Sequence, residues 1–559
     1  MASYAEKPWL KSYHIGPYKL ARSMTYREVP LYAFLDEAAE NYADNVAIFY
    51  LGGKITYAEM KLYTDKLASA LVDLGVEKGD RVAIYLPNCP QLIMSLYGII
   101  RTGAISVPLS SDLGVEELEV QLRESGATAL ITLDKYLEAV DSVRDKTEVK
   151  EVIVTSVEDF SPQEEPEIEE IPGTWNLRKL LADAFPEPPL VEIDPKEDLV
   201  ALFFTGGSTG LPKAVMHTHF SFGAYTASQI PWILSPLKHG IAGKASIFVP
   251  MAHHAGVILG IVEGVYWGLR MIMIPDPWDA KGLVDTIQEF RPFMLFTFPG
   301  QLMRLVSHGV RRTQTMAVAI GEPLPGEVAD DWRAKTGMPV TQVYALSEVG
   351  GMCDLSVFSR LTGFAGKEKR GLGVPCVELE AKVVDPVTGE DVPFGEVGEI
   401  CIKGPQLMKG YWPTPGKGLI DGWLYTGDLG YMDEDGYFFL VDRCADLPKI
   451  EGAVIYTTTV DDALYKHPAV MMAAAVGVPD PEHPESEWIK AFVKLEEEYV
   501  GKVTAEEIIE HCKAHLPPQA VPKAVEFREQ LPLTVTGKFF KRKLREEEIA
   551  RIKEKGEMK

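Results

Sequence analysis

The chain has 559 residues, of which 46% are hydrophobic and 25% are charged, and its formal net charge is −25. Such a length and composition are typical of a globular protein with several domains and large cores. The strong negative charge argues against nucleic acid and against anionic membranes as main partners. The six cysteines are scattered without a C-x-x-C pair, which indicates reduced structural thiols instead of a disulfide framework or a zinc site.

The start of the chain, MASYAEKPWLKSYHIG, has no apolar core and does not resemble a secretory signal. The two most apolar stretches, near residues 89–109 and 255–274, contain internal glycines and are interrupted by Arg101, and by Glu263 with Arg270. A buried helix followed by a strand explains each of them better than a membrane span does. We therefore expect no transmembrane segment and a cytoplasmic protein.

Helical and strand patterns alternate in the first part of the chain. Thr56 and Glu59 form a capping box before a helix that Gly75 ends. Strands are expected at residues 81–86, 104–109 and 128–132. Helices are expected between them, from about residue 90 and at 115–125. Residues 156–173 are rich in Glu and Pro and are expected to form a solvated surface excursion.

Residues 202–213, LFFTGGSTGLPK, break an apolar run with glycines and hydroxyl residues and end in Lys213. Glycine lets successive backbone N–H groups converge on an anion, and a lysine adds a compact positive charge. The Walker pattern does not fit, because Lys213 follows Gly-Leu-Pro, and G-x-G-x-x-G is absent. The loop indicates a phosphate site of another kind, with a flexible strand-to-helix turn as the structural alternative.

The alternation of helices and strands returns at residues 281–344, and it predicts parallel sheets covered by helices. From about 371 to 441, short strands separated by turn signals predict an antiparallel sheet or small barrel. The last hundred residues carry mixed strands and helices, such as a helix at 504–516. They end in a Lys/Arg/Glu-rich segment that we expect to be a solvated amphipathic helix.

Five further segments follow the glycine loop in order: GEPLP (321–325), YALSE (344–348), GWLYTGDLGYMDEDGY (422–437), VDRCADLPKIEG (441–452) and LPLTVTGKFFKRKLR (531–545). Together with KGYW at 409–412, this ordered set resembles the adenylate-forming superfamily. That superfamily contains acyl-CoA synthetases, peptide-synthetase adenylation domains and beetle luciferases. The resemblance covers nearly the whole chain and is closest to the fatty-acyl-CoA ligases.

The resemblance implies an α/β fold in three parts. Residues 1–442 would form a large N-terminal domain of helix-covered sheets with a small antiparallel β subdomain, residues 443–446 a hinge, and residues 447–559 a small mobile α+β domain. It also implies a reaction in two steps. A carboxylic acid, expected to be a medium- or long-chain fatty acid, attacks the α-phosphate of ATP and gives an acyl-adenylate and pyrophosphate. Coenzyme A then displaces AMP to form a thioester. Mg²⁺ is the implied metal, and a homodimer is one expected assembly.

The resemblance also implies a role for single residues in binding the nucleotide. The β- and γ-phosphates would lie against the glycine loop, at Thr205, Gly206, Gly207, Ser208, Thr209, Gly210 and Lys213. Glu348 would hold Mg²⁺, and Ser347, where the family usually has threonine, would contact the α-phosphate. A solvated glutamate at a strand end is the structural alternative for Glu348.

The nucleoside is implied to lie among residues of three segments. Tyr344 would stack on adenine, with Gly321, Glu322 and Pro323 forming the wall of the pocket; a core tyrosine is the alternative for Tyr344. Asp428 would accept from both ribose hydroxyls, and Arg443 would add a donor to the same ribose.

Three residues are implied to act in single steps of the reaction. Lys538 would be the mobile lysine that enters the site only for adenylation, and a turn tip is its alternative. His253 or His254 matches a family histidine beside the acyl carboxylate, and a buried structural histidine is the alternative. Gly452, in the segment that faces the active site for the coenzyme A step, would leave room for the thiol.

Several positions depart from the family pattern: Ala214, Ala345, Ala445, Pro448, Thr457 and Thr459. Ala345 replaces a glycine that borders the acyl pocket, so we expect a narrower pocket. Pro448 removes a backbone donor from the segment used in the coenzyme A step. Two other functions therefore stay open: an enzyme that loads the acyl group onto a carrier-protein thiol, and a weakly active homologue that binds nucleotide.

Overall fold

The computed structural model describes residues 3–15, 18–162, 171–205, 212–228, 241–248, 251–252, 254–353, 371–444, 447–450, 453–480, 487–532 and 540–554.

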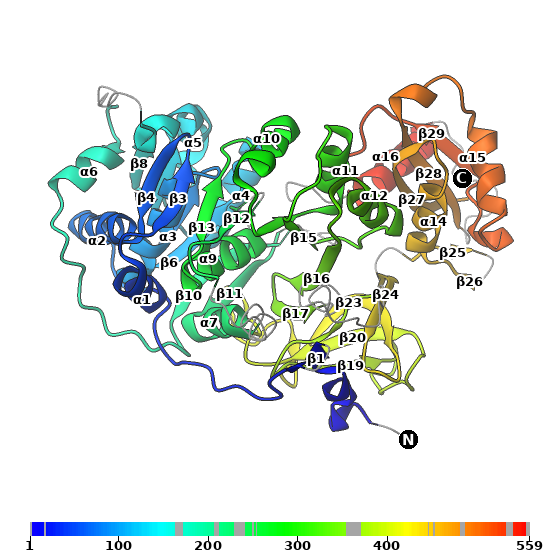
Figure 1. Ribbon diagram of the computed structural model, residues 1–559, viewed down its shortest axis with the longest axis horizontal. Helices are drawn as coiled ribbons and strands as arrows, with labels where there is room; N and C mark the ends of the chain where they lie inside the picture. The colour runs from blue at the N-terminus through cyan, green and yellow to red at the C-terminus, as the bar shows by residue number, and fades with distance from the viewer. Residues whose placement is uncertain are drawn as a thin grey trace.

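Two large sheets occupy the centre of the molecule, and helices cover them (Figure 1). Their strand orders are β21-β11-β10-β6-β5-β7-β8-β9 and β18-β17-β16-β15-β14-β12-β13-β3-β4. The first sheet contains β5 (Arg81–Tyr85), β6 (Ile105–Leu109), β7 (Ala129–Leu133), β8 (Glu151–Thr155), β9 (Trp175–Asn176), β10 (Leu199–Phe204), β11 (Ala214–Thr218) and β21 (Gly410–Tyr411). The second contains β3 (Val46–Tyr50), β4 (Gly53–Thr56), β12 (Ala245–Phe248), β13 (Arg270–Met273), β14 (Met294–Thr297), β15 (Met316–Ile320), β16 (Val340–Leu346), β17 (Val349–Cys353) and β18 (Val374–Pro375).

Most neighbouring strands in both sheets are parallel, as the alternating pattern predicts, including the edge pair β8–β9, whereas several pairs toward the other edges are antiparallel. In the first sheet β10 pairs antiparallel with β11, and β11 with β21. In the second, β16 pairs antiparallel with β17, β17 with β18, and β3 with β4. The expectation of parallel sheets is therefore corrected at these pairs. Strands β3–β4 and β16–β17 are joined by turns too short for a parallel crossover, whereas β11–β21 and β17–β18 join segments that are farther apart in the chain.

The helices follow the expected order. Thr56 and Glu59 form the predicted capping box at the start of α2. Every residue of α3 is buried, so the apolar stretch near residues 89–109 is a core helix and strand. The helices of this part are α1 (Ala33–Tyr42), α2 (Tyr57–Asp73), α3 (Pro90–Arg101), α4 (Val115–Ser125), α5 (Leu137–Arg144), α6 (Leu177–Asp183), α7 (His219–Ser228), the π-helix η5 (Gly256–Val262), α9 (Glu263–Tyr266), α10 (Ala280–Phe290), α11 (Pro299–Ser307) and α12 (Gly326–Thr336). Among the described residues, no helix has the length and apolar character needed to cross a membrane.

A smaller antiparallel sheet follows, as predicted for residues 371–441. It contains β19 (Glu380–Val384), β20 (Gly398–Lys403), β22 (Leu419–Ile420), β23 (Trp423–Met432) and β24 (Phe438–Arg443). The short strands β1 (His14–Ile15) and β2 (Tyr18–Lys19) pair with each other near the N-terminus.

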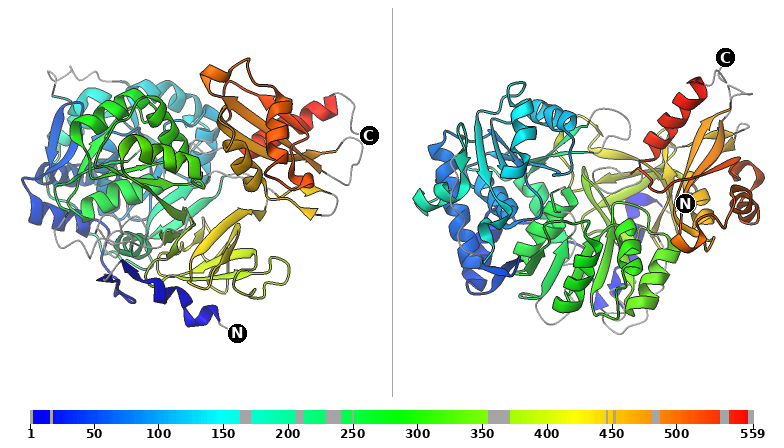
Figure 2. Two further views of the ribbon diagram at one scale, coloured as in Figure 1. Left: turned by 45° about the vertical axis from the view of Figure 1, so that its right-hand side comes forward. Right: turned by 90° about the horizontal axis from the view of Figure 1, so that it is seen from above.

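The C-terminal part, orange to red in Figures 1 and 2, lies at one end of the molecule. Its apolar cores contain only residues from Ile450 onward. The Lys/Arg/Glu-rich tail forms α16, which buries Leu544, Glu548 and Ile552 and exposes its other face, as expected of an amphipathic helix. The elements are β25 (Lys449–Ile450), β26 (Ala453–Val454), α14 (Thr457–Tyr465), β27 (Val470–Pro479), β28 (Glu487–Leu495), α15 (Ala505–Lys513), β29 (Ala524–Phe527) and α16 (Lys541–Glu554).

Candidate functional site

Three of the predicted nucleotide-binding residues meet in one hydrogen-bonded cluster. The Tyr344 hydroxyl donates to Asp428 Oδ2 at 2.7 Å, and Arg443 Nε donates to Asp428 Oδ1 at 2.6 Å. Asp428 is 3% exposed, whereas the Arg443 side chain is 43% exposed. Burial, and then the neighbouring Asp428 carboxylate, raise the pKa of Tyr344 well above its usual value, so its hydroxyl stays a donor.

The Thr-Gly-Asp turn explains why Asp428 points at Tyr344. Gly427 has a φ of +72°, which favours glycine, and its N–H donates to Glu399 Oε1 at 2.8 Å. The Thr426 hydroxyl donates to the Ile400 carbonyl at 2.7 Å and accepts from the Asp428 N–H at 3.1 Å. These bonds fix the backbone of strand β23 at residues 426–428, and Asp428 lies opposite Arg443 of β24.

Glu348, the predicted metal ligand, lies in the turn between β16 and β17. Its Oε1 accepts a 2.7 Å hydrogen bond from the Tyr411 hydroxyl, and its backbone carbonyl accepts from the Met408 N–H at 2.8 Å. None of the described residues donates a hydrogen bond to Oε2. The Lys213 ammonium lies 5.0 Å from the centroid of the same Tyr411 ring, at a distance typical of a cation–π contact. One tyrosine thus contacts both Glu348 and Lys213.

His217, on β11, holds the residue before Glu348. Its Nε2–H donates to the Ser347 carbonyl at 2.7 Å, and its Nδ1 accepts from the Ser221 hydroxyl at 3.3 Å. Burial lowers the pKa of His217 to about 4, so the ring is neutral at pH 7. Sequence reasoning missed both His217 and Tyr411. Tyr411 stands in the quoted KGYW segment and could have been found there, whereas His217 carries no such signal.

The glycine loop joins two antiparallel strands, β10 and β11. The Thr205 N–H donates to the Lys213 carbonyl at 2.9 Å, which closes the base of the loop. The strand-to-helix alternative for this segment is therefore wrong. The loop residues Gly206, Gly207, Ser208, Thr209 and Gly210 lie outside the described residues, as do His253, Gly452 and Lys538.

The remaining predicted residues lie next to the elements that carry Tyr344 and His217. Gly321, Glu322 and Pro323 follow β15, and the Leu324 N–H donates to Gln342 Oε1 of the neighbouring β16. His254 is 6% exposed and its ring lies 5.1 Å from that of His217, centroid to centroid. This packing fits the structural role for His254.

The part of the chain that the structure describes contains no group of three or more His, Cys, Asp or Glu side chains that could hold a metal ion.

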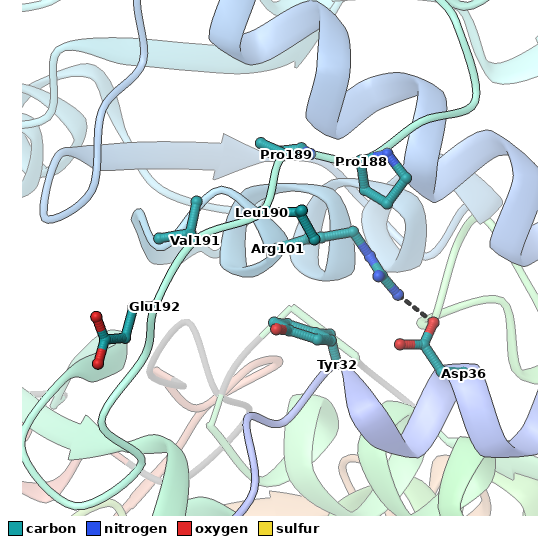
Figure 3. Close-up of a pocket in the computed structure, with 8 residues that line it drawn as sticks. All are labelled: Tyr32, Asp36, Arg101, Pro188, Pro189, Leu190, Val191 and Glu192. Atoms are coloured by element: carbon teal, nitrogen blue, oxygen red, sulfur yellow. Dashed lines mark hydrogen bonds and ion pairs between the residues drawn. The ribbon is translucent and has the colours of Figure 1, made fainter.

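A separate cavity of about 420 Å³ lies between α1, α3 and residues 188–192 (Figure 3). There Arg101 stacks on Tyr32 and forms ion pairs with Asp36 and with Asp65. No predicted site residue lines this cavity, and its buried cation is already neutralised.

A family model described as AMP-binding enzyme matches residues 35–412, and one described as AMP-binding enzyme C-terminal domain matches residues 459–538. The chain belongs to the AMP-binding enzyme family. The long-chain-fatty-acid–CoA ligase of Bacillus subtilis is 33% identical over an alignment of 569 positions, which covers 97% of this chain and 98% of that protein. The enzyme of the same name from Salmonella typhimurium is 31% identical and covers 94% and 96%. These relatives confirm the predicted resemblance and the prediction of an enzyme of the acid–thiol ligase class.

Solved structures share the architecture. The anthranilate CoA ligase AuaEII in complex with anthranoyl-AMP matches with a TM-score of 0.80 at 22% identity, over 94% of this chain and 98% of that one. ATP-bound MatB from Rhodopseudomonas palustris also matches with a TM-score of 0.80, at 24% identity, over 94% and 99%. At this identity the likeness shows the fold, and it confirms the predicted α/β class with an α+β C-terminal part.

Proposed function

We propose that this protein activates a medium- or long-chain fatty acid with ATP and transfers the acyl group to coenzyme A. The observation that carries the proposal is the near-full-length similarity to ligases named for long-chain fatty acids and CoA. In the first step, an oxygen of the acid attacks the α-phosphorus of ATP and the bond to pyrophosphate breaks. In the second, the thiol sulfur of coenzyme A attacks the acyl carbon, its proton is lost, and AMP leaves.

The cluster of Tyr344, Asp428 and Arg443 supports binding of the nucleoside. The Asp428 carboxylate is held from two sides and can share its lone pairs with the ribose hydroxyls, and Arg443 places a guanidinium beside the same carboxylate. We assign Tyr344, with Gly321, Glu322 and Pro323, to the adenine pocket. A preformed set of donors and acceptors lowers the cost of ordering side chains when the nucleotide binds.

The residues around the glycine loop suit phosphate and a metal. Thr205 and Lys213 close the loop, and we assign residues 205–210, Lys213 and Ser347 to the phosphates. Glu348 offers Oε2, a hard oxygen ligand, and Mg²⁺ usually takes only one or two carboxylates together with phosphate oxygens. Bound there, Mg²⁺ would neutralise phosphate charge and orient the leaving pyrophosphate.

We assign further roles in both steps of the reaction to residues outside the described segments. Lys538 would serve adenylation, His253 would lie beside the acyl carboxylate, and Gly452 would admit the thiol. The proposed domains are residues 1–442 and 447–559, joined at the hinge 443–446. The separate apolar cores of the C-terminal part support this division.

An aromatic acid is the second candidate substrate. A feruloyl-CoA synthase from an Amycolatopsis species is 30% identical over 511 residues, which cover 89% of this chain and 95% of that protein. Ala345, partly buried beside Tyr344, supports a narrower acyl pocket than glycine would give. Acid-dependent thioester formation should be compared across saturated fatty acids and cinnamic or benzoic acids, in the wild type and in Ala345→Gly. We expect fatty acids to be preferred and Ala345→Gly to shift the profile toward longer or bulkier acids. A preference for aromatic acids would replace the substrate proposal.

Pyrophosphate release tests the reaction itself. It should depend on the acid, on ATP and on Mg²⁺, and Glu348→Ala should slow it by roughly 10²–10³, as expected for the loss of one preorganised charged contact. Full activity of Glu348→Ala would contradict the metal assignment. A wild type that releases no pyrophosphate with any acid, while it still binds ATP, would favour the weakly active homologue.

A further inference from the structure

Tyr411 connects two charged side chains that come from distant parts of the sequence. Its hydroxyl donates to Glu348 Oε1 at 2.7 Å, and its ring lies 5.0 Å from the Lys213 ammonium. Glu348 is 63 positions from Tyr411 in the sequence, and Lys213 lies in another segment again. Neither contact follows from local structure, so the side chain of Tyr411 joins the base of the glycine loop to the turn that carries Glu348.

The backbone fixes where the Tyr411 ring lies. Strand β21 pairs with β11, with Tyr411 opposite Val215, and the Trp412 N–H donates to the Ala214 carbonyl at 2.8 Å. Lys213 immediately precedes β11, so its ammonium reaches the ring from the neighbouring strand. Strand β21 is thereby bonded to the edge of the eight-stranded sheet, and the ring is attached to that sheet through its backbone.

Glu348, by contrast, lies on a short turn between β16 and β17 and has several side-chain rotamers open to it. The hydrogen bond from Tyr411 selects one of them and occupies Oε1 only. Oε2 then keeps its lone pairs, and its direction is set by the bond to Oε1. A donor on a sheet strand that orders a carboxylate in this way is the arrangement that outer ligand partners have at metal sites.

We propose that Tyr411 is a positioning residue for adenylation, which holds Glu348 so that Oε2 faces the metal–ATP complex and keeps Lys213 beside the phosphates. This inference rests on the proposed function, because it needs Glu348 and Lys213 to act on ATP. Tyr411 is not assigned a contact with substrate. It acts through Glu348 by its hydroxyl and through Lys213 by its ring, and the two effects can be separated by substitution.

The test uses the full-length protein, acid-dependent pyrophosphate release and, as a readout apart from activity, the Mg²⁺ concentration needed for half-maximal ATP binding in calorimetry, which Tyr411→Phe should also raise. Tyr411→Phe removes the hydroxyl and keeps the ring on Lys213. It should raise the Mg²⁺ concentration for half-maximal rate by about 10-fold or more, the range typical of lost outer metal partners. The rate at saturating Mg²⁺ and ATP should fall much less. Tyr411→Leu also removes the ring, and it should further raise the KM for ATP at saturating Mg²⁺.

A matched control and a double variant distinguish positioning from a general effect on folding. Tyr50→Phe removes another tyrosine hydroxyl, one that also bonds a residue distant in the sequence: it donates to the Val157 carbonyl at 3.0 Å, 107 positions away. This variant should leave the Mg²⁺ dependence unchanged. In a Glu348→Ala background, Tyr411→Phe should cost nothing more. Equal Mg²⁺ dependence in Tyr411→Phe and wild type, or an undiminished cost in the Glu348→Ala background, would overturn the inference. A wild type that releases no pyrophosphate would instead refute the proposed function, so the two failures are distinct.

Discussion

Asp428 shows how single residues prepare this site before any ligand binds. Both of its carboxylate oxygens accept hydrogen bonds, one from Tyr344 and one from Arg443, although the residue is almost fully buried. A buried carboxylate without partners would be costly, and these two donors offset that cost. The Arg443 side chain is 43% exposed, so a ligand can reach it from solvent while Asp428 stays buried.

Asp428→Asn tests this arrangement. The amide keeps the shape of the carboxylate but loses its charge, and it brings an NH₂ group that cannot accept from Arg443 or from a ribose hydroxyl. Hydrogen bonds to charged groups contribute about 1.5–3 kcal/mol, so the KM for ATP should rise roughly 10- to 100-fold. Steady-state pyrophosphate release at varied ATP measures it. Tyr344→Phe, which removes one donor and keeps the ring, should have a smaller effect. An unchanged KM with a lowered melting temperature would mean that Asp428 only supports the fold.

For single residues, the sequence predicted which side chains belong to the site, but it did not predict the hydrogen bonds between them. Tyr344 and Asp428 stand in short motifs that resemble those of a known superfamily, but they are 84 positions apart, and no local pattern predicts their hydrogen bond. Tyr411 stood in a quoted segment without a role, because its two contacts depend on how β21 pairs with β11. His217 was missed because its bond to the Ser347 carbonyl joins residues that are 130 positions apart.

Elements were predicted well where periodicity is local. The helices and strands of residues 81–133 begin and end within about a residue of their expected positions, because apolar spacing and caps act over a few residues. The antiparallel edges were not predicted. Strand β21 has only two residues, and its place beside β11 depends on a partner nearly two hundred positions earlier.

Helix α14 receives its N-terminal cap from a distant element. Its own N-cap residue, Tyr456, makes no side-chain capping bond. Instead Asp442 Oδ2, at the end of β24, accepts from the Thr458 N–H at 3.3 Å and from the Thr457 hydroxyl at 3.2 Å. Lys541 of α16 also donates to the Thr457 hydroxyl, at 2.9 Å. This gives Thr457, a departure from the family pattern, a structural role.

Asp442→Ala should therefore loosen α14 more than other elements. The first amides of the helix lose their acceptor, and lost caps cost about 0.5–2 kcal/mol. Amide hydrogen exchange of residues 457–465 should become faster, while exchange in α2 stays unchanged. Thr459→Ala is the matched control, because Thr459 is exposed in the same turn and its side chain makes no hydrogen bond to the described residues. Equal protection of α14 in both variants would show that Asp442 does not cap the helix.

The whole molecule consists of a large sheet-containing part and a smaller C-terminal part with its own cores. Asp442, one residue before Arg443, lies where the chain crosses from one to the other, and its bonds to α14 tie the two parts together. Pro448 follows this crossing and packs against Gly477 of β27, where a Cβ would lie 2.3 Å from the proline ring. A proline there stiffens the chain just beyond the proposed hinge.

These features bear on the alternation of domains that the family resemblance implies. Lys538 and Gly452 would face the active site in different orientations of the C-terminal part. Lys538→Ala should therefore abolish adenylation and leave transfer from preformed acyl-adenylate to coenzyme A largely intact. Gly452→Trp should do the reverse, because its side chain would block the thiol. If the ties at Asp442 and the stiffness at Pro448 slow the rotation, the wild type should accumulate acyl-adenylate in a burst before thioester appears. Single-turnover kinetics with labelled ATP follow both species. Equal slowing of the two half-reactions by Lys538→Ala would refute alternation here and make Lys538 a residue that supports the fold.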